Sequence, residues 1–110
     1  MNIRLEVLRY ADFQSDYNDK NDKIILEELL INEDWTYLEG WLYKWLELNH
    51  KVYANVYYSR FMNCWNYSIT MKLKDKYNKW KDIEEINFKT RELALNAMIE
   101  KLELVLEEEK

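Results

Sequence analysis

Apolar and polar residues alternate without a break through residues 65–73, and this alternation limits the possible folds of the chain more than any other feature. The apolar positions are Trp65, Tyr67, Ile69, Met71 and Leu73, and asparagine, serine, threonine and lysine stand between them. Successive side chains of a strand point to opposite faces of a sheet. The pattern therefore predicts a strand with one apolar and one polar face, as in a sheet covered on a single face.

Further strands are expected on both sides of this one. Residues 52–58 are rich in β-branched and aromatic side chains, which strands favour. A predicted turn over 74–78 leads to a third strand over 79–83, or a little beyond. Near the start of the chain, residues 3–10 alternate between apolar and charged side chains and predict a strand, with a short helix running to Phe13 as the alternative.

Two helices are marked by capping residues. The pattern Thr36-x-x-Glu39 is a capping box, and it predicts a helix that ends near Asn49. Thr90 is a good N-cap for a final helix over 91–107, whose apolar residues recur at the i, i+3, i+4, i+7 spacing of one helix face.

Residues 23–31 add a short predicted helix, so the expected order of elements is (β)-α-α-β-β-β-α. The chain is expected to form a single domain over residues 1–110, with residues 1–33 as an N-terminal extension and residues 35–107 as the core. The predicted fold class is α+β, a three- to four-stranded antiparallel meander with helices packed on one face.

The sequence offers no recognisable catalytic or metal centre. His50 and Cys64 are the single histidine and cysteine, so neither a Cys–His catalytic pair nor an ordinary zinc site is predicted. Residues 16–27 faintly resemble a calcium loop, but Lys20 would put a cation among the ligands. One glycine and no proline argue against a glycine-rich phosphate loop. We therefore expect no enzyme activity, no cofactor and no bound metal.

Charge is divided along the chain. Residues 1–50 hold 11 acids and 5 bases, residues 51–81 hold 7 bases and 1 acid, and residues 82–110 hold 9 acids and 4 bases. The basic stretch is also rich in tyrosine and tryptophan, a combination that can bind single-stranded nucleic acid or a signalling nucleotide. The alternative is that its lysines protect a sheet edge and its rings form core. The candidate anion-binding residues are Tyr58, Arg60, Lys74, Lys76 and Lys79.

The predicted helix over 36–49 carries more aromatic residues than one core-facing stripe requires. One interpretation is an interface, for a homodimer or for docking a host protein, because aromatic anchors dominate binding hot spots. The other is that residues 1–31 fold over the second side of the helix. The candidate partner-binding residues are Trp35, Trp41, Trp45 and Glu39. The acidic helices could likewise imitate a phosphate backbone, or simply keep the protein soluble.

Four short segments from Trp35 onward carry a family resemblance. They are Leu-Glu-Gly-Trp-Leu at 38–42, Val-Tyr-Ala-Asn-Val at 52–56, Trp-Asn-Tyr-Ser-Ile at 65–69 and Phe-Lys-Thr-Arg-Glu-Leu-Ala-Leu-Asn-Ala-Met-Ile at 88–99. Together they resemble small, mostly uncharacterised phage and prophage proteins of bacteria. The resemblance implies a phage context and brings no catalytic residues with it. Small accessory phage proteins, such as anti-CRISPR and other anti-defence inhibitors, often act by binding.

We therefore expect a phage-type accessory protein that binds and inhibits a bacterial host protein or nucleoprotein complex, with an anti-CRISPR or other anti-defence role. The alternative is a module that binds single-stranded nucleic acid or a signalling nucleotide through residues 51–81. No long apolar run follows Met1, so we expect neither export nor membrane insertion, and a location in the host cytoplasm.

Overall fold

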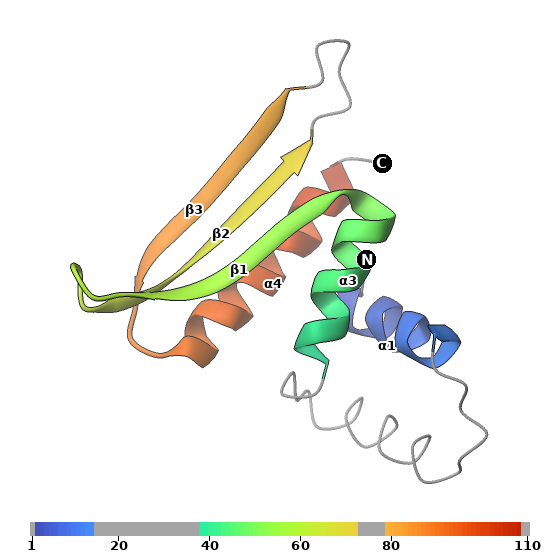
Figure 1. Ribbon diagram of the computed structural model, residues 1–110, viewed down its shortest axis with the longest axis horizontal. Coiled ribbons are helices and arrows are strands. Elements are labelled where there is room, and N and C mark those ends of the chain that lie inside the picture. The colour runs from blue at the N-terminus through green and yellow to red at the C-terminus, as the bar shows by residue number, and fades with distance from the viewer. Residues whose placement is uncertain (1, 15–37, 73–78, 109–110) are drawn as a thin grey trace, which may run out of the picture.

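The chain folds into helices and a small antiparallel sheet, which confirms the predicted α+β class (Figure 1). The computed structural model describes residues 2–14, 38–72 and 79–108. Within those ranges the elements are α1 (Ile3–Gln14), α3 (Glu39–His50), β1 (Val52–Ser59), β2 (Cys64–Lys72), β3 (Trp80–Phe88) and α4 (Arg91–Glu108). The helix predicted over 23–31 lies outside the described residues.

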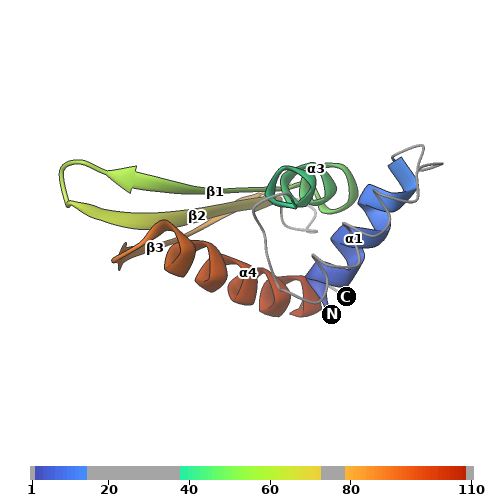
Figure 2. The ribbon, with the colours of Figure 1, turned by 90° about the horizontal axis from the view of Figure 1, so that it is seen from below.

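The sheet is a meander in which β2 lies between β1 and β3, and both pairings are antiparallel. Figure 2 shows α4 running along one side of the sheet, α3 lying beyond the start of β1, and α1 beyond α3. In the described part of the chain, therefore, helices cover one face of the sheet and leave the other uncovered, as the alternation in β2 predicts.

The core lies between β2 and α4. Tyr67, Ile69 and Met71 are buried on the helix-covered face, and they belong to one cluster with the inner side chains of α4. Ile69 faces Ala54 of β1 and Ile83 of β3 across the sheet. The α4 residues that close the cluster are Leu95, Met98, Ile99, Leu102, Val105 and Leu106.

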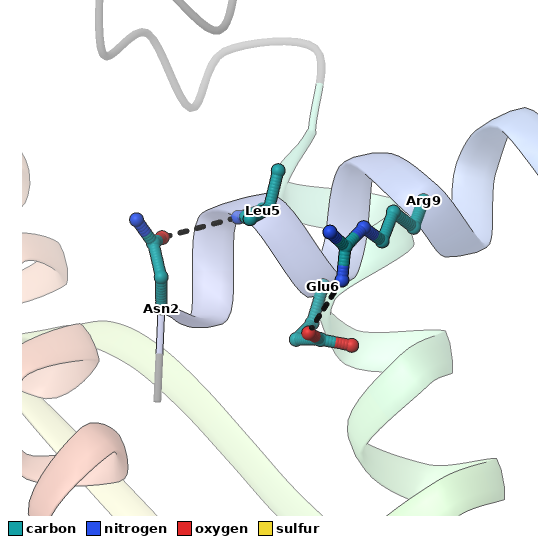
Figure 3. A network of polar contacts seen from close by, with 4 residues as sticks. All are labelled: Asn2, Leu5, Glu6 and Arg9. Atoms are coloured by element: carbon teal, nitrogen blue, oxygen red, sulfur yellow. Dashed lines mark hydrogen bonds and ion pairs between the residues drawn. The ribbon is translucent and has the colours of Figure 1, made fainter.

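The strand predicted over residues 3–10 is wrong, and the alternative helix is correct. Ile3, Val7, Leu8 and Ala11 are buried, whereas Leu5 is only half-buried; burial at i, i+4, i+5 and i+8 is the pattern of one helix face, while a strand would bury every second residue. The Asn2 side chain accepts a hydrogen bond from the Leu5 backbone N–H at 3.1 Å and so caps α1 (Figure 3). This N-cap is the sequence signal that distinguishes the helix from a short alternating strand.

The alternation in β2 is broken at one position. Asn66 is fully buried although the pattern predicts it on the polar face, and Trp65 is only half-buried. The cause is a register shift between Trp65 and Tyr67, where Asn87 of β3 takes a left-handed φ of 80°. The Asn66 side-chain oxygen accepts hydrogen bonds from the Asn87 N–H at 3.2 Å and from the Cys64 thiol at 3.3 Å, whereas its side-chain nitrogen is buried without a hydrogen-bond partner among the described residues.

The predicted N-cap of α4 is observed, whereas α3 begins differently from the prediction. Thr90 caps α4 as predicted, because its hydroxyl accepts the Leu93 N–H at 3.2 Å. Helix α3 begins at Glu39, and its N-cap Leu38 makes no side-chain capping bond. Thr36 lies outside the described residues, and the Glu39 carboxylate is held by other partners, described below.

We predict that two leucines of α4 differ greatly in their effect on stability. Leu102 is fully buried and Leu104 is 62% exposed. Leu102→Ala should lower the free energy of unfolding by about 2–5 kcal/mol, because it leaves a cavity under the sheet. Leu104→Ala is the matched control and should change it by less than about 0.5 kcal/mol. Urea unfolding of the two variants measures both values, and equal losses would contradict the placement of α4.

Candidate interaction surface

The aromatic residues of α3 form core and leave little contact surface for a partner. Trp45 is 6% exposed and its ring packs edge-on against the His50 ring, with centroids 4.7 Å apart. Trp41 is half-buried against Tyr10 of α1, with ring centroids 6.0 Å apart. Helix α1 thus covers the side of α3 for which the sequence offered two interpretations, an interface or packing by residues 1–31. Trp35 lies outside the described residues.

Glu39 is engaged in a polar clamp between the starts of α3 and α4. Its carboxylate accepts a hydrogen bond from the Tyr43 hydroxyl at 2.6 Å and pairs with the Arg91 guanidinium at 2.5 Å. Burial and the bond to Glu39 raise the pKa of Tyr43 well above its ordinary value of 10.0. The hydrogen bond to Glu39 likewise raises the pKa of Arg91. The clamp links the starts of two helices, and its groups already satisfy one another.

Those candidate anion-binding residues that the structure describes do not gather into one site. Tyr58 and Arg60 lie at the β1–β2 turn, whereas Lys79 directly precedes β3 at the opposite end of the strands. Lys74 and Lys76 lie outside the described residues. On the uncovered face between the two ends, β3 places Asp82 and Glu84, which would repel phosphate.

The uncovered face of the sheet is a ladder of polar side chains bonded across the strands. The Thr70 hydroxyl donates to the Asp82 carboxylate at 2.8 Å. The Ser68 hydroxyl donates to the Asn55 side-chain oxygen in the next row, and the Tyr57 hydroxyl donates to Glu84. The bond to Glu84 raises the pKa of Tyr57. These groups are hydrogen-bonded to one another within the sheet. At one end of this face the rings of Tyr53 from β1 and Trp80 from β3 meet across β2, with centroids 5.9 Å apart.

The β1–β2 turn is the most exposed apolar feature of the described chain, and we name residues 60–63 the hairpin tip. Phe61 is 100% exposed and Met62 is 46% exposed. Figures 1 and 2 show this turn at the far end of the sheet from α3 and α1. From the sequence alone, residues 59–63 indicate only a connection between two strands. The signal that the sequence offered was a phenylalanine and a methionine in a turn between two confidently predicted strands.

The hairpin tip is held by its own polar contacts. The Ser59 hydroxyl accepts the Met62 N–H at 3.2 Å, and Asn63 takes a left-handed φ of 53°. The Tyr58 hydroxyl donates to the Asn63 side chain, while the Tyr58 ring packs edge-on against Trp65 with centroids 5.3 Å apart. Phe61 is therefore presented on a defined turn.

The described ranges contain neither a candidate metal site nor a candidate membrane-spanning helix. Residues 2–14, 38–72 and 79–108 contain no group of three or more histidine, cysteine, aspartate or glutamate side chains that could hold a metal ion. None of the helices in these ranges has the length and apolar character needed to cross a membrane.

We predict that the Glu39 clamp contributes a pH-dependent part of the stability. Because folding raises the pKa of Tyr43, its contribution is complete below the ordinary tyrosine value of 10.0 and is lost as the pH rises above it. Tyr43→Phe should cost about 1 kcal/mol at neutral pH through the lost hydrogen bond. It should also reduce the decline of stability at alkaline pH.

Urea unfolding at neutral pH and about one unit above the ordinary tyrosine pKa measures both effects. Tyr53→Phe is the control, because Tyr53 is an exposed ring of the sheet edge. An alkaline decline that is identical in wild type and Tyr43→Phe would contradict a role for the clamp.

Comparisons of this chain with known proteins find no match. No protein-family model, no curated protein and no solved structure matches it.

Proposed function

We propose that this chain is a binding protein of the phage accessory type, which inhibits a bacterial host complex by inserting its hairpin tip into an apolar pocket of that complex. The observation that carries the proposal is the full exposure of Phe61 on a turn with defined internal contacts. The resemblance of the sequence to phage and prophage proteins supports the biological context. The anti-defence role, an anti-CRISPR function included, belongs to this proposal.

The energetics favour the tip as the principal contact. Burying a phenylalanine side chain is worth about 1.5–3 kcal/mol, and aromatic residues of this kind form the centres of protein interfaces. The hydrogen bonds from the Met62 N–H to Ser59 and from the Tyr58 hydroxyl to Asn63 hold the turn before binding, so little conformational entropy is lost when a partner closes around it. Among exposed apolar residues of the described chain, none is more accessible than Phe61.

The charge of the tip indicates the chemistry of the pocket. Arg60 is exposed beside Phe61, and it is the one charged residue among residues 60–63. An apolar pocket with carboxylates at its rim would bury the ring and pair with the guanidinium. Met62 adds a flexible apolar side chain that adapts to an irregular pocket wall.

The α4 helix offers a second, weaker contact. Its exposed residues include Glu92, Glu100, Glu107 and Glu108, a carboxylate surface that could face a basic channel of a nucleoprotein complex. Such contacts weaken with salt, whereas the Phe61 contact does not. Varying the ionic strength therefore separates the apolar contact of Phe61 from the charged contacts of Arg60 and α4.

We predict that Phe61→Ala weakens partner binding by about 30-fold or more, because truncation of a central aromatic anchor commonly costs 2 kcal/mol or more. Wild type, Phe61→Ala and Leu104→Ala would each be used as bait in lysates of the bacterial host. A partner recovered with the first and third baits but lost with the second would then be purified. Its dissociation constant and its own activity would be measured with each variant.

Leu104 is the matched control because it is also an exposed apolar residue, but it lies on α4. A purified partner that binds wild type and Phe61→Ala equally would show that the tip is not the contact. A partner whose activity is unchanged by the bound wild-type protein would contradict inhibition. Loss of binding with Leu104→Ala alone would assign the contact to α4.

A further inference from the structure

The two edges of the sheet differ in how they are protected against pairing. In the part of the chain that the structure describes, strands β1 and β3 are the edges, and each leaves the backbone N–H and C=O of every second residue pointing away from the sheet. Strand β3 carries four charged residues and the bulge at Asn87. Strand β1 has the sequence Val-Tyr-Ala-Asn-Val-Tyr-Tyr-Ser, with no charge, no proline and no glycine. Charges and bulges are the usual means of blocking an edge strand, and β1 has neither.

We propose that two copies of this chain associate through β1, with the two β1 strands antiparallel about a twofold axis so that the sheets join into one. The pairing satisfies the outward-pointing backbone groups of both edges. It uses the same surface on each copy, as a twofold dimer requires.

The order of side chains on β1 suits pairing with itself. Val52, Ala54 and Val56 lie on the helix-covered face, since they stand opposite Met71, Ile69 and Tyr67. Tyr53, Asn55 and Tyr57 therefore lie on the uncovered face. Residues directly opposite in an antiparallel pair share a face. A twofold axis at Asn55 meets this condition, because it sets Tyr53 against Tyr57 of the second copy and Ala54 against Val56.

Charge selects β1 over β3 for this contact. The chain carries a net charge of −5, which opposes association of two copies. Pairing through β1 brings no charged side chains of the two strands together. Pairing through β3 would bring the acidic residues Asp82, Glu84 and Glu85 of the two copies close together, and like charges facing each other destabilise a strand pair.

The test uses opposite charges at the centre of β1. Asn55→Lys and Asn55→Asp each place two like charges together at the twofold axis, and each should weaken dimerisation about five-fold. An equal mixture of the two variants should restore a dimer, because a lysine then faces an aspartate. Sedimentation velocity over a concentration series distinguishes the 13.7 kDa monomer from a species of twice that mass.

The control is Ile86→Lys, which adds one charge to the exposed surface of the other edge strand and should leave the dimer intact. Asn55→Asp keeps an acceptor for the Ser68 hydroxyl, so it retains the fold even if the lysine variant does not. A wild-type protein that stays monomeric at all concentrations would overturn the proposal. So would a dimer that both Asn55 variants leave unchanged, or a mixture that associates no better than each variant alone.

Discussion

The structure depends on one contact, the burial of the apolar row of β2 beneath α4. Tyr67, Ile69 and Met71 lose nearly all solvent exposure there, and each such burial is worth about 1.5–3 kcal/mol. A three-stranded sheet without a covering layer would be marginal in water. With one face buried by α4, the opposite face is free to be polar, and its rows are bonded from strand to strand. The uncovered face and the exposed edges are thus consequences of how the core is built.

The contacts among the helices determine which side chains of the helices remain exposed. The Glu39 clamp joins the starts of α3 and α4, and α1 seals Trp41. The tryptophans of α3 are therefore packed within the fold. The most exposed apolar residue of the described chain, Phe61, lies far from these helices, at the hairpin tip. Because the tip lies at one end of a stiff hairpin, it can reach a partner without disturbance of the core.

Prediction from the sequence succeeded where the local pattern was long and failed where it was short. Nine alternating residues defined β2, and Thr90 marked the start of α4 correctly. At residues 3–10, three apolar positions at a spacing of two fitted a strand, yet Ile3, Val7 and Ala11 also fitted a helix face, and contact with α3 decided between them. The buried Asn66 was hidden from the pattern because a bulge depends on the partner strand.

The sequence by itself determined the α+β class, the order of the three strands and the one-sided sheet, since periodicity and caps act over a few neighbouring residues. Only the tertiary structure decided which aromatic residues are core and which are surface, because burial depends on what packs from elsewhere in the chain. Trp45 and Phe61 are both large apolar residues in the sequence. One lies beneath the rest of the fold and the other stands on a turn that nothing in the described chain covers.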